Sequence, residues 1–169
     1  MTRYALITPQ GAIDRHAANI DPTAQTKAGW RWLPVEDVAP PAATGLEVLL
    51  SDYVVGASKV TQTWAKTRRA LEAQKQAVKA EAQRRIIAVT GTADLTSCMI
   101  KQANANMRAN ELNDKRLGGQ ALTAEEAAEA QALRDLAAAI KGIRVASNNI
   151  EAMSPIPLDY TSDSYWPEA

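Results

Sequence analysis

The 169-residue sequence has no phenylalanine, one cysteine, one histidine and no net charge, because 19 basic residues balance 19 acidic ones. The single cysteine, Cys98, excludes an internal disulfide and fits a protein made in a reducing compartment. Zero net charge gives no electrostatic case for binding nucleic acid. No apolar run reaches the roughly 20 residues of a membrane span, and the N-terminus lacks the layout of a signal peptide. We therefore expect synthesis in the cytoplasm and no binding to membranes or nucleic acid.

Groups for catalysis or metal binding are scarce as well. His16 has Asp14 and Asp21 near it, but a lone histidine between scattered acids is a weak pattern, and we expect a surface residue in a loop. Cys98 lies among apolar neighbours, which favours a buried and unreactive thiol. The sequence contains neither a cysteine–histidine pair at zinc-ligand spacing nor a phosphate-binding glycine loop. The prediction is a protein without enzymatic activity, cofactor or metal.

Residue patterning divides the chain into three regions and predicts the α+β class. Residues 1–67 hold three of the four tryptophans and several β-branched stretches, so we expect a small antiparallel β-rich head. The end of this region predicts a hairpin, "GLEVLLSDYVV" and "SKVTQTWAK" joined by a turn at "GAS". Residues 68–153 predict three long helices, as a bundle or coiled coil. Residues 154–169, with three prolines and no helical period, predict an extended tail.

The ends of the three helices carry recognisable signals. The first helix ends at "TGTAD", where Thr92 or Asp94 is an N-cap for the second. The second ends at "LGG", where Gly118 suits a left-handed cap position. The third begins with a capping box made by Thr123 and Glu126.

An apolar seam runs along the third helix at spacings of three and four, interrupted locally by Gly142. Such spacing is typical of interchain packing in coiled coils. The residues that we expect in this packing are Leu133, Leu136, Ile140, Ile143 and Ile150. In the tail, Tyr160, Tyr165 and Trp166 fit a latch that inserts into a groove of a neighbour, or a segment that folds back on its own domain.

The stretch "IKQANANMRANELNDKR" raises a question of its own, because asparagine is a mediocre helix former. If it is helical, one seam consists of amides, namely Gln102, Asn106, Asn110 and Asn113. Polar residues at core positions fix register and oligomer state at a cost in stability. Alternatively, this face is solvated while Leu95, Met107 and Leu112 pack elsewhere. The sequence leaves both interpretations open.

Two features resemble a known group of proteins. One is the N-terminal plan "YALIT…GWRWLPV…LLSDYVVGASKVTQTWA", whose last strand leads directly into a charged helix. The other is the helical half from "NELNDKRLGGQALTAEEAAEAQ" to "RVASNNIEAM". Together they are similar to small proteins encoded near the tail-fibre genes of tailed bacteriophages. Some of these are virion components and others are fibre-assembly factors, and the resemblance implies no catalytic residues.

From composition and resemblance together we expect a structural component of a bacteriophage tail, in the tail tip, baseplate or fibre-attachment region. It would act in the virion through contacts with itself, as a homotrimer, and with other tail or fibre proteins. The alternative is a non-virion chaperone for tail-fibre assembly. A third hypothesis, a host-directed regulator that binds nucleic acid, predicts retention on DNA that falls steeply with salt.

Overall fold

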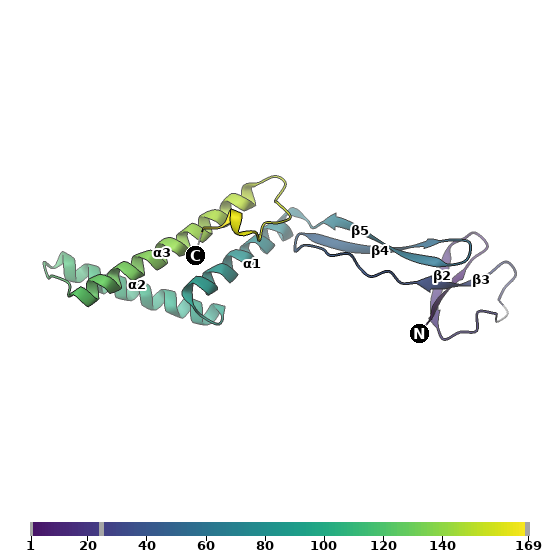
Figure 1. Ribbon diagram of the computed structural model, residues 1–169, viewed down its shortest axis with the longest axis horizontal. Coiled ribbons are helices and arrows are strands. Elements are labelled where there is room, and N and C mark those ends of the chain that lie inside the picture. Colours follow the sequence, from purple (N-terminus) through teal and green to yellow (C-terminus); the bar gives the residue numbers. More distant parts are fainter. Residues whose placement is uncertain (1, 24–25, 168–169) are drawn as a thin grey trace. The chain divides into compact units, whose positions relative to one another are not determined.

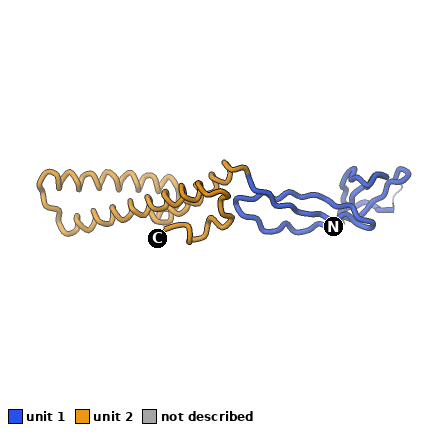
Figure 2. Tube along the Cα trace, turned by 90° about the horizontal axis from the view of Figure 1, so that it is seen from above, with its two compact units in different colours: residues 1–69 blue, residues 70–169 orange. Residues whose placement is uncertain are grey.

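A computed structural model describes residues 2–23 and 26–167 of the chain. The chain forms two compact units, residues 1–69 and 70–169 (Figure 2). The first unit is a five-stranded sheet and the second contains three helices, so the fold is α+β (Figure 1). The predicted coiled coil and extended tail are wrong, since the described residues show neither. The helices pack within one chain, and the C-terminal segment folds onto them.

The sheet consists of β1 (Arg3–Ile7), β2 (Ile13–Ala18), β3 (Arg31–Glu36), β4 (Glu47–Val55) and β5 (Val60–Arg68), in the order β2-β1-β3-β5-β4. All neighbours are antiparallel except β3 and β5, which pair in parallel over two residues. The expectation of a wholly antiparallel head is therefore wrong. The buried apolar core of this unit consists of Ala5, Ile7, Leu33, Val35 and Val60.

After β3 the chain continues beside β5 before it enters β4, because Val38 is hydrogen-bonded to the side chains of Gln62 and Trp64. The predicted hairpin is present, with the Gly56 amide donating to the Lys59 carbonyl at 2.8 Å. Beyond Thr61, β5 has no strand on the side away from β4 among the described residues. The indole of Trp64 there donates to the Val38 carbonyl at 2.8 Å. Pro40 and Pro41 follow Val38 and carry no amide hydrogen, so this connection cannot form a regular ladder with β5.

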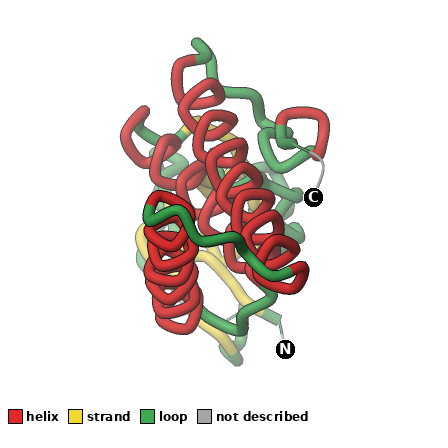
Figure 3. The backbone as a smooth tube through the Cα atoms, turned by 90° about the vertical axis from the view of Figure 1, so that its left-hand side faces the viewer, coloured by secondary structure: helices red, strands yellow, loops and turns green. Residues whose placement is uncertain are grey.

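The helices are α1 (Leu71–Thr90), α2 (Leu95–Leu117) and α3 (Ala124–Ala152). Asp94 caps α2 by accepting the Ser97 amide at 2.8 Å, and both hydrogen bonds of the capping box at Thr123 are present. The residue in the left-handed region after α2 is Gly119, with φ of 77°, and not Gly118 as predicted. Figure 3 shows this connection in front, as a green loop that crosses from one red helix to the other.

The C-terminal segment is compact because its apolar side chains are buried within the helical unit. Ile156 is fully buried, and Tyr160 and Trp166 are 7% and 5% exposed. A short 3-10 helix, Asp163–Tyr165, precedes Trp166. Pro167 lies so close to α3 that a Cβ atom on Gly142 would be 3.3 Å from its Cγ. The glycine that interrupts the apolar seam is thus the place where the C-terminal segment approaches the helix.

Candidate interaction surfaces

A groove of about 510 Å³ runs between α2 and α3. The amides Gln102, Asn106 and Asn113 line it from α2, and Leu133 and Leu136 from α3. The structure therefore brings the two seams of the sequence together along one groove. Small side chains keep it open, since Ala105, Ala109, Ala130 and Ala137 also line it.

The predicted packing residues of α3 divide into two groups. Ile140, Ile143 and Ile150 are 7%, 5% and 1% exposed, so their burial is complete within one chain. Leu133 and Leu136 are only half-buried, at the open part of the groove. The seam therefore packs within the chain over its C-terminal half and remains partly open to solvent over its N-terminal half.

Ion pairs hold α2 against α3 next to their connection. Arg108 lies 2.9 Å from Glu129, and Lys115 lies 2.7 Å from Glu126. The hydrogen bond from Lys115 lowers the pKa of the Glu126 carboxyl, and that from Arg108 lowers the pKa of the Glu129 carboxyl. These pairs therefore link the two helices beside the groove.

The groove itself is basic. Its lining includes Arg116, Arg134, Lys141 and Arg144 and no acidic residue. None of these four cations forms an ion pair with a carboxylate in residues 2–23 and 26–167. Instead, Arg134 donates to the Gln131 side chain at 2.8 Å and Arg144 to the Gln102 side chain at 3.4 Å. The positive charge of the groove is therefore unbalanced locally, although the chain as a whole is neutral.

A smaller hollow of about 340 Å³ adjoins the groove, where all three helices meet. Gln102 and Arg144 border both hollows, so their hydrogen bond lies between them. Cys98 lines this hollow at 1% exposure, and its sulfur accepts from the Gln102 amide at 3.0 Å. The thiol is buried, as the sequence predicted.

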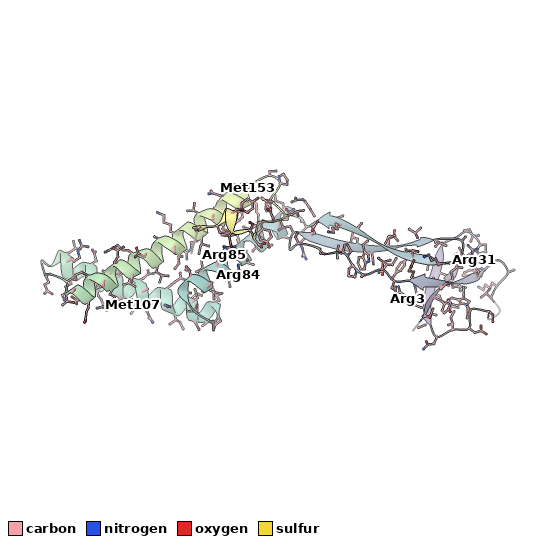
Figure 4. All side chains as sticks on the ribbon, in the orientation of Figure 1. Arg3, Arg31, Arg84, Arg85, Met107 and Met153 are labelled. Atoms are coloured by element: carbon pink, nitrogen blue, oxygen red, sulfur yellow. The ribbon has the colours of Figure 1, made fainter. Side chains whose placement is uncertain are left out.

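An exposed apolar stripe lies on α2, and none of its residues lines the groove. Ile100, Met107 (labelled in Figure 4) and Leu117 are 56%, 62% and 77% exposed. At 100° per residue they fall within about 100° of one another around the helix, with Ala103, Asn110 and Asp114 between them. We call these six residues the α2 stripe. Asn110 is therefore separated from the other predicted amides, because it does not line the groove.

The α2 stripe was not found in the sequence. Asparagine and aspartate lie between its apolar residues, so the sequence shows no clear helical spacing of apolar residues there. The suggestion that Leu95, Met107 and Leu112 pack elsewhere holds only for Leu112, which is 2% exposed. Leu95 is 43% exposed.

The predicted latch residues lie on their own chain. Arg85 of α1 (Figure 4) donates to the Thr161 carbonyl at 2.8 Å and to Asp163 at 2.7 Å, and its guanidinium lies 5.0 Å from the centre of the Trp166 ring. The Trp166 indole donates to the Tyr160 carbonyl at 2.8 Å. Tyr165 is half-buried, and the hydroxyl–carboxylate distance to Asp159 is 3.4 Å. Of the two interpretations of this segment, the structure shows the one in which it folds back.

A buried carboxylate orients Arg85. Glu81, 8% exposed, accepts from Arg84 at 2.6 Å and from Arg85 at 2.8 Å. The hydrogen bond from Arg84, together with that from Arg85, lowers the pKa of the Glu81 carboxyl against the opposing effect of burial. Burial, with a smaller contribution from Glu81, raises the pKa of the Tyr160 hydroxyl. Both arginines thus compensate the charge of Glu81.

The described residues contain no group of three or more acidic, histidine or cysteine side chains that could hold a metal ion. His16 is exposed on β2, with its ring 4.8 Å from that of Tyr53, so its predicted location in a loop is wrong. No helix among these residues has the length and apolar character that crossing a bilayer requires.

No protein-family model matches the chain, and no curated protein or solved structure shows significant similarity to it.

Proposed function

We propose that this chain is a structural, non-catalytic component of a bacteriophage tail, in the tail tip, baseplate or fibre-attachment region. It acts there through contacts with copies of itself and with other tail or fibre proteins. The observation that carries the proposal is the α2 stripe, whose large apolar side chains are more than half exposed in the single chain. The tail assignment rests on the resemblance in the strand and helix segments quoted above.

The stripe favours self-association through α2. Completely burying a side chain of this size contributes about 1.5–3 kcal/mol, so Ile100, Met107 and Leu117 together provide several kcal/mol for each copy. Asn110 lies within the stripe, where an amide can pair with its counterpart on another copy and fix the register. Asp114 also lies within the stripe around the helix axis and is exposed in the single chain. The resemblance to tail-fibre-associated proteins favours a homotrimer, with the α2 helices at its centre.

The proposed location in the particle is tested by quantitative mass spectrometry on purified virions of a phage that encodes the chain. Signal is scaled against the major tail protein. A fixed copy number of a few to a few dozen per particle is the expected result. Absence from particles together with abundance in the infected-cell lysate would contradict it and favour the assembly chaperone.

A further inference from the structure

We propose that the groove between α2 and α3 binds an acidic amphipathic helix of a partner protein. None of the residues of the α2 stripe lines the groove, so this inference does not depend on self-association or on the phage assignment. It rests on three properties of the groove: its apolar floor, its length and its charge.

The floor suits apolar side chains. Leu112, Leu133, Leu136 and Ile140 contribute to it, along with four alanines. A volume of about 510 Å³ lies within the range of clefts that bind ligands in proteins. Leu133 and Leu136 are half-buried as they stand, so an occupant would complete their removal from water.

The length and register suit a helix. The lining extends over residues 102–116 of α2 and 130–144 of α3, a rise of about 21 Å along each helix. This is the length of a helix of about 14 residues. Arg134 and Lys141 are seven residues apart, or about 10.5 Å along the axis. In a partner helix that lies along the groove, side chains seven residues apart are also about 10.5 Å apart, so they can face Arg134 and Lys141 together. In a strand, side chains on one face repeat about every 6.8 Å and would not match this spacing.

The charge determines the chemistry of the partner. Elsewhere in the helical unit many cations already have a carboxylate: Lys79 has Glu151, Arg85 has Glu81, Arg108 has Glu129 and Lys115 has Glu126. The four cations of the groove have none within the described residues, although three of them share one helix within eleven residues. Glutamates at heptad spacing on both flanks of a partner helix would complement them. The amides Gln102, Asn106 and Asn113 add hydrogen-bond donors on the opposite wall.

The test uses the full chain and a labelled synthetic probe of 16 residues, with leucine on one helical face and glutamate on its flanks. Fluorescence anisotropy measures binding at 0.15 M salt. A second probe has every glutamate replaced by lysine, and a third has the composition of the first in scrambled order. The first probe should bind at least tenfold more tightly than either of the others.

Matched variants locate the site. Arg134→Glu with Lys141→Glu reverses two charges in the groove, and Arg31→Glu with Lys75→Glu makes the same change in net charge outside it. The groove variant should bind the acidic probe at least tenfold more weakly, a loss of about 1.4 kcal/mol or more, and the control should bind as the wild type does. If the groove variant loses its helical circular dichroism, Arg134→Gln with Lys141→Gln is used in its place. This variant should also bind the acidic probe more weakly than the wild type does.

Three results would overturn the proposal. One is equal affinity of the wild type for the glutamate and lysine probes. Another is unchanged binding to the groove variant. The third is displacement of the probe by a second copy of the chain at rising protein concentration, which would make the groove an interface between copies.

Discussion

Replacing Trp166 by alanine should destabilise the helical unit. The side chain is 5% exposed, packs under the guanidinium of Arg85 and donates a hydrogen bond to the Tyr160 carbonyl. Substitutions of buried tryptophan by alanine cost about 3–5 kcal/mol, and we expect the lower value, about 3 kcal/mol, because the segment lies near a chain end and can relax. Loss of the anchor also exposes Ile156 and Tyr160.

Trp166→Phe separates packing from the hydrogen bond. It keeps a ring beneath Arg85 but removes the indole donor, which leaves the Tyr160 carbonyl without that partner and costs about 1 kcal/mol. Urea unfolding followed by circular dichroism at 222 nm measures both free energies, because that signal comes mainly from the helices. Comparisons are made at one protein concentration, since self-association contributes to apparent stability.

The reasoning would be refuted by a Trp166→Ala variant whose free energy of unfolding stays within about 0.5 kcal/mol of the wild type, an effect typical of a surface position. Unchanged unfolding accompanied by a lower oligomer mass would have a different meaning. It would show that the segment acts on a neighbouring copy, which is the latch that the sequence also allowed.

Three further predictions concern the same helical unit. The folded-state pKa of Glu81 lies below its ordinary value of 4.5, so its contribution to stability is present above pH 4.5 and is lost as the pH falls through the lowered pKa. Below pH 4.5, the unfolding free energy should therefore change less steeply with pH in Glu81→Gln than in the wild type. Equal slopes in the two proteins would contradict this prediction. Gly142→Leu should detach Pro167 from α3, so that the C-terminus is trimmed faster by carboxypeptidase. An unchanged trimming rate would argue against the contact, and Ala128→Leu, at an exposed position of α3, serves as a control for a leucine substitution. The thiol of Cys98 should react with Ellman's reagent only at the rate of local opening, and rapid stoichiometric labelling of the native protein would refute its burial.

Features governed by neighbouring residues could be predicted from the sequence. The capping box at Thr123 and the cap at Asp94 involve residues three positions apart, so the pattern contains all the information. The β4–β5 hairpin was predicted for the same reason, from alternation on both sides of a short turn. The left-handed residue after α2 was misplaced by one position, because two adjacent glycines are both able to adopt it.

Features governed by distant residues were missed. The strand β2 is polar and mostly exposed, and pairing with β1 stabilises it although its own composition does not predict a strand. The C-terminal segment has no helical period, which suggested an extended tail. Its fold depends instead on Arg85, about 80 residues earlier in the chain, which binds the Thr161 carbonyl and Asp163.

The candidate surfaces were predicted in part. The sequence predicted the amide seam of α2 and the apolar seam of α3, but periodicity alone does not show which element packs against a given face of a helix. The structure shows that Ile143 and Ile150 are buried within the chain while Leu133 borders an open groove. The α2 stripe became visible only once exposure was known for Ile100 and Met107.

Sedimentation equilibrium of the full chain tests the proposed self-association most directly. The wild type should have three times the monomer mass of 18.2 kDa, and Ile100→Glu with Met107→Glu should reduce it to that of the monomer while keeping the helical circular dichroism. Leu50→Glu with Val54→Glu, at two similarly exposed apolar positions on β4, should leave the mass unchanged. A wild type that is monomeric at all concentrations, or a double α2 variant with the mass of the wild type, would contradict assembly through α2.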